Sequence, residues 1–333
     1  MPMLHSHLTT LNAVSLVLAT FKDQGLPSSD VLLAGSGIGV ADLRHADSRI
    51  TTCQEMRVCA NAVALRCDIG LDLGQRMHVS SYGLLGYALL TSATFGDALR
   101  VALRYPALLG TLFDLSLEDD GERIWFSAAD YREDPALARF NVEFCLVSLK
   151  VICDDLLGQP LPLLEARFEH PAPDYQARYA ERFDCPVRFR ARSNAFAFDR
   201  AWLQHPLPLA DAVTHRAMAE RCRKENTEFT GRQAWLNRVR QLLADQLQAA
   251  PGLVGLAAQM NCSARTLRRH LHALGCSYQQ LLDELRFEQA KQWLASDQMP
   301  IHQIAEQLGF SETASFRHAF VRWSGVAPSL MRH

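Results

Sequence analysis

A cluster of cationic side chains lies near the C-terminal end of the chain. Arg265, Arg268, Arg269 and His272 recur at the i, i+3, i+4 and i+7 positions, which share one face of an α-helix. Guanidinium groups donate hydrogen bonds to phosphate oxygens and to the edge of guanine, so this spacing is typical of a helix that binds DNA. A solvated helix face has the same pattern, and the spacing alone does not separate the two explanations.

The sequence around this cluster contains an internal repeat. Residues 256–267 and 304–316 correspond with an offset of 48 residues up to a serine and of 49 residues beyond it. The matched pairs are Leu256 and Ile304, Ala257 and Ala305, Met260 and Leu308, Ser263 and Ser311, Leu267 and Phe316, and Leu271 and Phe320. The pattern predicts a helix-turn-helix that occurs twice, with one additional residue in the second turn.

The residue types at each turn suit this prediction. Asn261 and Gly309 occupy the position that requires a positive φ, which Asn and Gly adopt at low cost. Ser263 and Ser311 offer hydroxyl caps to the helices that follow. The side chains left on the outside are the candidate DNA contacts. They are Ser263, Arg265, Thr266, Arg268, Arg269, His272, Ser311, Thr313, Ser315, Arg317, His318 and Arg322.

A helix predicted over residues 278–295 connects the two units and is about 25 Å long. Recognition helices held apart by such a helix could enter successive major grooves, which lie ~34 Å apart on one face of DNA. We therefore expect double-stranded DNA as the partner, with one monomer reading a bipartite site.

Charge is distributed unevenly along the 333 residues. The net charge is −2, but residues from 231 onward carry a balance of +4 and residues 1–230 a balance of −6. A basic C-terminal part suits phosphate neutralisation, and an acidic front part argues against DNA contact there. No apolar run reaches the ~20 residues of a membrane helix and no signal peptide is evident, so we expect a cytoplasmic protein without membrane contact.

The nine cysteines indicate a reducing compartment. Their number is odd, no Cys-x-x-Cys pair occurs, and the gaps between Cys53, Cys59 and Cys67 match no zinc motif. We expect reduced, mostly buried thiols, no metal and no cofactor, with a redox-sensing pair as the alternative.

The polar, aperiodic segment 223–231 predicts a linker between a domain over residues 1–222 and a domain over residues 232–333. In the first domain we expect helices at 11–21, 92–105, 135–157 and 175–183, and strands at 112–117, 123–128, 164–168, 186–190 and 195–198. The mixture favours an α+β fold with an antiparallel sheet, and the second domain is expected to be all-α with two helix-turn-helix units.

Six polar residues of the first domain could line a pocket for a small carboxylate, which arginine pairs bind through two hydrogen bonds. They are His78, Tyr82, Arg104, Tyr105, Arg188 and Arg190. A competing explanation for Arg104 and Tyr105 is that they satisfy carbonyl groups at a helix end. Residues 83–86 lack the spacing of a phosphate loop and instead predict close helix packing.

The C-terminal stretch contains Ile304-Ala305, Gly309-Phe310-Ser311, Phe316, Ala319-Phe320, Arg322-Trp323, Gly325-Val326 and Pro328, with Leu285-Arg286 and Ala290 before them. Through these residues it resembles the AraC/XylS family of transcription regulators. Two residues depart from the family pattern. His318 stands where Arg is common, which makes one contact weaker or pH-dependent, and Asn261 stands where Gly is frequent.

The front part contains Leu71-Asp72-Leu73-Gly74, Gly83-Leu84-Leu85-Gly86-Tyr87-Ala88, Thr94-Phe95-Gly96-Asp97-Ala98-Leu99, Arg104-Tyr105, Cys185-Pro186-Val187-Arg188-Phe189, Ala195-Phe196-Ala197-Phe198, Trp202-Leu203 and Pro206-Leu207-Pro208. Through these residues, and over about residues 15–215, it resembles the arabinose-binding-type sensor domain of regulators akin to the ornithine-utilisation regulator. The resemblance implies a small-molecule effector of unknown identity, transcription activation through RNA polymerase, and a homodimer.

Three function classes follow. The favoured one is an effector-responsive regulator, and the second is a ligand-independent DNA-binding protein whose first domain only dimerises. The third, an enzyme with a DNA-binding appendage, finds no nucleophile elbow, His-Glu-x-x-His motif or Walker loop in the sequence.

Overall fold

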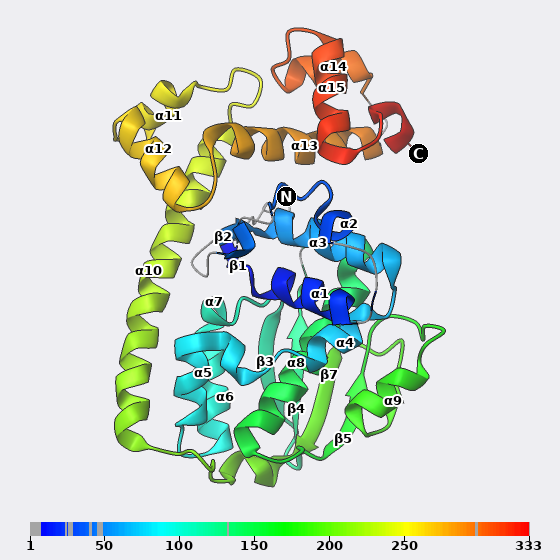
Figure 1. The fold of residues 1–333 in the computed structure, drawn as a ribbon, viewed down its shortest axis with the longest axis vertical. Coiled ribbons are helices and arrows are strands. Elements are labelled where there is room, and N and C mark those ends of the chain that lie inside the picture. The colour runs from blue at the N-terminus through cyan, green and yellow to red at the C-terminus, as the bar shows by residue number, and fades with distance from the viewer. Residues whose placement is uncertain are drawn as a thin grey trace. The chain divides into compact units, whose positions relative to one another are not determined.

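The computed structural model describes residues 8–23, 25, 29–39, 42–44, 49–131, 133–296 and 299–332 (Figure 1). These residues form two compact units. The described part of the first unit lies within residues 12–34 and 55–230. That of the second lies within residues 8–11, 35–54 and 231–332.

A five-stranded sheet organises the first unit. Its strands run in the order β3 (Asp114–Asp119), β4 (Arg123–Ala129), β7 (Asn194–Asp199), β5 (Leu163–Arg167) and β6 (Val187–Arg188). Three of the four neighbouring pairs are antiparallel, and β5 and β6 are parallel. The predicted α+β class is therefore confirmed, while the parallel pair at the edge was not predicted.

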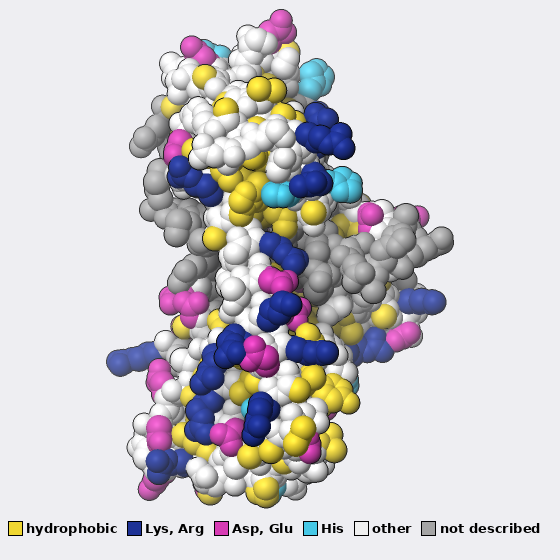
Figure 2. All heavy atoms as spheres, turned by 90° about the vertical axis from the view of Figure 1, so that its left-hand side faces the viewer, with side chains coloured by type: hydrophobic (Ala, Val, Ile, Leu, Met, Phe, Trp, Pro, Cys, Tyr) yellow, Lys and Arg dark blue, Asp and Glu magenta, His cyan; other side chains and the backbone are white. Residues whose placement is uncertain are grey.

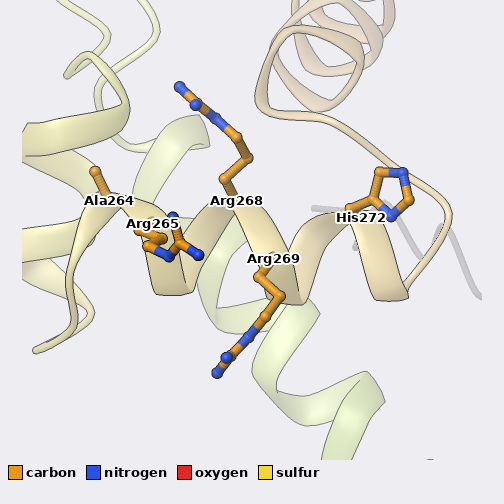
Figure 3. A pocket seen from close by; sticks show the side chains of 5 residues that line it. All are labelled: Ala264, Arg265, Arg268, Arg269 and His272. Atoms are coloured by element: carbon orange, nitrogen blue, oxygen red, sulfur yellow. The ribbon is translucent and has the colours of Figure 1, made fainter.

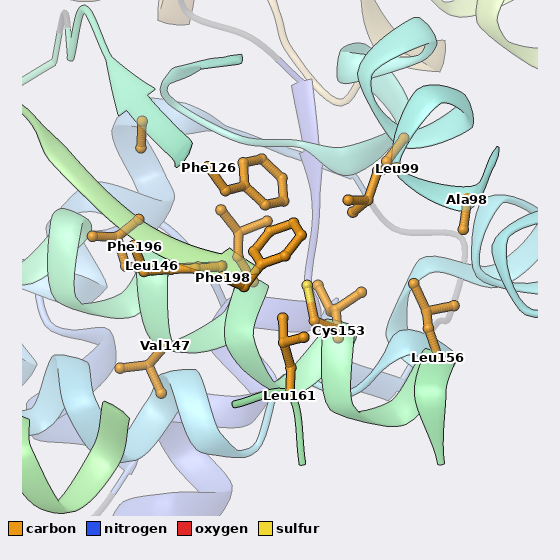
Figure 4. Packing of buried hydrophobic residues seen from close by; sticks show 14 of the residues in the cluster. Ala98, Leu99, Phe126, Leu146, Val147, Cys153, Leu156, Leu161, Phe196 and Phe198 are labelled. Atoms are coloured by element: carbon orange, nitrogen blue, oxygen red, sulfur yellow. The ribbon is translucent and has the colours of Figure 1, made fainter. Parts of the chain in front are cut away.

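The alternation of side chains along the strands forms the core of this unit. Phe126, Phe196 and Phe198 project from one face of the sheet and pack with Leu146 and Cys153 of the long helix α8 (Ala138–Leu157), as Figure 4 shows. Each phenyl ring is at most 2% exposed, and burying such a side chain contributes about 1.5–3 kcal/mol. The helix predicted over residues 135–157 thus forms the opposing layer of the core.

Shorter helices complete the first unit. They are α1 (Asn12–Asp23), α2 (Ser29–Leu33), α3 (Thr52–Leu65), α4 (Ile69–Gln75), η2 (Val79–Tyr82), α5 (Gly83–Leu90), α6 (Phe95–Arg104), α7 (Pro106–Leu109), η3 (Pro135–Leu137), α9 (Ala177–Phe183) and η4 (Arg200–Gln204), with α3 starting in the second unit. A Cβ on Gly74 would stand 2.6 Å from Cβ of Val147, so glycine lets α4 lie directly on α8. A Cβ on Gly86 would meet the carbonyl oxygen of Val79 at 2.2 Å, which confirms the predicted close packing at this position.

One helix, α10 (Ala212–Ala244), contains 33 residues and includes the whole segment 223–231. The hydroxyls of Thr227 and Thr230 donate hydrogen bonds to the carbonyls of Arg223 and Asn226, one turn earlier. The predicted linker is thus helical and not irregular chain. A helix that is polar all round has no apolar periodicity, so the sequence pattern did not reveal it. The division into domains at this segment stays a prediction.

The second unit is helical apart from β1 (Leu8–Thr10) and β2 (Arg49–Thr51), and it also includes η1 (Asp42–Arg44). After α10 it contains α11 (Leu253–Gln259), α12 (Ala264–Ala273), α13 (Tyr278–Ser296), α14 (Ile301–Gln307), α15 (Thr313–Ser324) and η5 (Pro328–Met331). One hydrophobic cluster joins these helices to the end of α10. Within the described residues, no helix combines the length and the apolarity that crossing a membrane requires.

Candidate nucleic-acid interface

The two predicted turns have the same backbone hydrogen bonds. In the first, the amide of Cys262 donates to the carbonyl of Ala257, and that of Asn261 to the carbonyl of Ala258. In the second, Phe310 donates to Ala305 and Gly309 to Glu306. Both are Schellman motifs, which close a helix through a residue of positive φ. Asn261 has φ +52° and Gly309 has φ +75°, so the predicted repeat and its turn residues are confirmed.

The caps of the two recognition helices differ. Ser263 caps α12 as predicted, because its hydroxyl accepts a hydrogen bond of 3.1 Å from the amide of Thr266. The prediction for Ser311 is wrong, since the N-cap of α15 is Glu312, whose side chain makes no capping hydrogen bond. The additional residue in the second turn explains the difference, because an offset of 49 places Glu312, not Ser311, at the position of Ser263.

Helix α12 presents a cationic face. Leu267 and Leu271 are buried, while Arg265, Arg268 and Arg269 are exposed. With Ala264 and His272, the three arginines line a shallow hollow of about 490 Å³. Figure 3 shows Arg268 and Arg269 pointing to opposite sides of the helix with Arg265 between them. In the described part of the chain, none of these arginines forms an ion pair.

Helix α15 is less cationic. Phe316 and Phe320 are buried, and the side chains of Ser315, Arg317 and His318 are exposed, as predicted from the repeat. Thr313 is half-buried, like Thr266 in the first helix-turn-helix unit, and Ser311 is exposed in the turn before the helix. Arg322 is exposed but forms an ion pair of 3.0 Å with Asp283 of α13, so a phosphate group would have to compete with that carboxylate.

Two contacts of α13 that the sequence analysis missed hold the helix-turn-helix units in place. Arg240 of α10 is buried and donates to Glu284 at 2.9 Å, and burial raises the pKa of this carboxyl. Arg286 donates to the carbonyl of Gly309 at 3.4 Å, and its guanidinium lies 4.8 Å from the centre of the Phe310 ring. Arg240 follows the buried Val239, and Glu284 and Arg286 flank the buried Leu285, so charges next to core positions were the available signal.

The length of α13 sets the spacing of the two helix-turn-helix units. Its 19 residues span about 28 Å. Figure 1 shows α12 beside one end of α13 and α15 beside the other end. The predicted arrangement of two recognition helices joined by one long helix is therefore present.

The six candidate ligand residues lie in three separate places of the first unit. His78 pairs with Asp155 at 3.0 Å, and Tyr82 nearby packs against the core. Arg188 pairs with Glu165 at 3.1 Å, and Arg190 lies in a turn with φ +55°. Arg104 and Tyr105, at the end of α6, line a groove of about 940 Å³ together with residues of α10. The structure therefore places this last pair at a groove.

A buried carboxyl that the sequence analysis did not identify lies between α4, α8 and α9. Glu143 is fully buried, and one of its oxygens accepts hydrogen bonds from the hydroxyls of Tyr175 (2.7 Å) and Tyr179. Its other oxygen has no hydrogen-bond partner. Burial raises the pKa of Glu143 to about 7, against the lowering effect of the two tyrosines.

The described residues contain no cluster of three His, Cys, Asp or Glu side chains arranged to hold a metal ion. Among the described residues, no cysteine forms a disulfide bond. Burial raises the pKa of several cysteine thiols, among them Cys59, Cys145 and Cys276.

Comparison with known proteins gives matches over most of the chain. The family model described as the arabinose-binding N-terminal domain of AraC transcription regulators matches residues 28–207, and a helix-turn-helix domain model matches residues 256–333. The ornithine utilization regulator of Pseudomonas aeruginosa is 35% identical over 275 residues, which cover 83% of this chain and 81% of the relative. The transcriptional regulator VqsM of the same organism is 30% identical over 271 residues, covering 79% and 83%. The crystal structure of the transcriptional regulator CdpR from Pseudomonas aeruginosa aligns over 95% of this chain and 96% of its own, with 24% identity and a TM-score of 0.45.

Proposed function

The chain belongs to the AraC family of DNA-binding transcription regulators and carries its arabinose-binding-type N-terminal domain, and we propose how it recognises DNA and how that binding is controlled. The exposed faces of α12 and α15 contact the operator. The first compact unit, called the N-terminal unit from here on, binds a small-molecule effector and forms a homodimer. The DNA-bound regulator activates transcription in the cytoplasm by contacting RNA polymerase. The word arabinose in the description of the domain names no ligand of this chain.

The observation that carries the DNA contact is the cationic face of α12. Arg265 stands three residues before Arg268 and four before Arg269, and all three are exposed without an ion-pair partner in the described residues. Like charges at these spacings destabilise a helix by about 0.2–0.5 kcal/mol per pair. The arrangement therefore costs folding free energy, and phosphate groups that neutralise the arginines would offset this cost.

The two recognition helices have different expected roles. The three arginines of α12 supply most of the phosphate attraction. Helix α15 contributes hydroxyls, His318 and Arg317, which forms no ion pair within the described residues. Helix α13 spans about 28 Å between the two helix-turn-helix units. One monomer therefore reads two short DNA segments that lie about one turn of the double helix apart.

DNA selection from a random pool with the purified full-length chain tests this proposal. The affinity for the selected operator is then measured at several salt concentrations for the wild type, Arg268→Ala and Arg269→Ala. A phosphate contact lowers the magnitude of the salt slope by about 0.9, and a base contact costs about 1–3 kcal/mol and relaxes specificity at one position.

Arg221→Ala is the matched control, because it removes the same charge from an exposed side chain of α10, which is not a recognition helix. Unchanged affinity and salt slope for both α12 variants would exclude these arginines from the interface. Hydroxyl-radical footprints with one short protected patch per monomer would contradict the bipartite site.

The alternative is a ligand-independent regulator whose N-terminal unit only dimerises. A metabolite that raises the melting temperature of the N-terminal unit favours effector sensing. A fragment of residues 231–333 that binds DNA regardless of any effector supports the proposed division of the chain. If that fragment folds and does not bind DNA, the division is wrong.

A further inference from the structure

A groove in the N-terminal unit lies between the end of α6 and the first half of α10. Its lining includes Arg104 and Tyr105 on one side and Arg216, Ala219 and Arg223 of α10 on the other. Figure 2 views the side of the molecule that carries α10 and shows Lys and Arg side chains interspersed with Asp and Glu along it. The volume of about 940 Å³ is sufficient for a small organic molecule.

The acidic groups of the groove already have partners, whereas two of its arginines form no ion pair with any residue that the structure describes. The carboxylate of Asp211 accepts a hydrogen bond of 2.6 Å from the amide of Thr214 at the start of α10, and hydrogen bonding with the side chain and then the amide of Thr214 lowers the pKa of this carboxyl. Glu220 forms an ion pair with Arg223. Arg104 and Arg216 are exposed, and neither takes part in an ion pair within the described residues. The groove therefore has two cationic groups available for an anion.

Small apolar side chains contribute to the lining of the groove. Four alanines, Ala93, Ala210, Ala212 and Ala219, line it together with the polar residues Thr91, His215 and Asn226. The ring of Tyr105 is 8% exposed and belongs to the core of the unit, so it forms a fixed part of the wall. Alanine methyl groups carry no hydrogen-bonding atoms, and they suit the hydrocarbon part of a ligand.

We propose that this groove is the effector site and that it binds an organic carboxylate. The carboxylate accepts hydrogen bonds from Arg104 and Arg216, and the aliphatic part of the molecule lies against the alanines. This assignment rests on the proposed function, because it names the site and the ligand class of the effector that the N-terminal unit senses.

The position of the groove on α10 connects it to the regulated part of the chain. Cys222 of α10 is buried in the core of the N-terminal unit, and Leu236 and Val239 of the same helix are buried in the core of the second unit. A ligand that contacts Arg216 and Ala219 binds this helix directly. Ligand binding to the first half of α10 therefore acts on the same helix that leads into the first helix-turn-helix unit.

The test uses the full-length chain and simple probes. Titration calorimetry at constant ionic strength measures the binding of hexanoate and octanoate, with hexanamide and octanamide as uncharged analogues. We expect the acids to bind and the amides to bind at least about tenfold more weakly, because a charged hydrogen bond is lost. Arg104→Ala and Arg216→Ala should each weaken acid binding by about tenfold or more.

Two further variants separate the groove from general charge and folding effects. Ala219→Phe fills the groove without changing charge and should abolish acid binding while the circular dichroism spectrum stays that of the wild type. Arg221→Ala removes a charge from α10 outside the groove and should change acid affinity by less than about twofold.

Failure of either acid to bind the wild type would overturn the assignment, as would binding that persists in Arg104→Ala, Arg216→Ala and Ala219→Phe. Operator affinity measured on the same proteins without any acid reports the proposed function separately. If the wild type binds its operator but acid binding does not depend on the groove residues, only the site assignment is wrong. If the wild type binds no DNA, the proposed function itself fails.

Discussion

Gly309 satisfies two constraints at once, and replacing it with alanine would violate both. Its φ of +75° lies in the left-handed region, and a Cβ there would stand 2.5 Å from the carbonyl oxygen of Gln248 and 2.9 Å from that of Leu247. These atoms belong to the backbone that follows α10, so no side-chain rotation relieves the overlap. The second turn therefore packs against the connection between α10 and α11 only because position 309 has no side chain.

The expected cost of Gly309→Ala has two parts. The left-handed conformation costs an alanine about 1–2 kcal/mol. The overlap with two carbonyl groups forces a shift of packed backbone, for which overpacking costs of about 1–3 kcal/mol are typical. We expect a total loss of about 2–5 kcal/mol from the stability of the second unit. Gly325→Ala is the matched control, since Gly325 has φ +80° but nothing within 4 Å of an added Cβ, and should lose only the first part.

Amide hydrogen exchange with mass spectrometry measures this difference in the full-length chain. Tryptophan fluorescence would mix the two units, because Trp125 and Trp202 lie in the first and Trp235, Trp293 and Trp323 in the second. Exchange of the buried amides of α14 and α15 reports the opening free energy of the second unit alone. Equal losses for Gly309→Ala and Gly325→Ala would refute the close approach at position 309.

Three further predictions concern single side chains. Ser263→Ala should destabilise the second unit by about 1 kcal/mol in the same exchange assay, because α12 loses its cap, and Ser311→Ala should have almost no effect; equal losses would contradict the different caps. The pKa of Glu143 is about 7 in the folded chain against an ordinary 4.5, so the unfolded chain releases this proton at lower pH and the free energy of unfolding falls as pH rises through that window. That fall is about 3 kcal/mol and should disappear in Glu143→Gln. Urea unfolding of both proteins at pH 5 and pH 8 measures it, and an equal change in the free energy of unfolding for the two proteins would contradict the prediction. Glu284→Gln leaves Arg240 buried without a charged partner and should cost about 3–5 kcal/mol in exchange-detected stability, whereas Arg240→Met/Glu284→Leu should recover most of it; an equally unstable double variant would refute this explanation.

Features that depend on residues close together in the chain could be predicted from the sequence. The helix-turn-helix repeat, the positive φ of Asn261 and Gly309 and the cap at Ser263 all involve partners within about five residues. The apolar periodicities that located β4, β7 and α8 are equally local. Local hydrogen bonding and side-chain periodicity are written in neighbouring residues, which is why these interpretations agreed with the structure.

Features that depend on distant partners were decided only by the tertiary structure. Nothing adjacent to Arg322 reveals Asp283, and nothing adjacent to Arg240 reveals Glu284, since each pair joins different helices. The groove at Arg104 likewise exists only because α10 packs beside the end of α6. The sequence by itself determined the family, the repeat and the cationic face of α12. Which of the other charges are neutralised depends on contacts between segments many residues apart, because the energy of a charge is set by its neighbours in space.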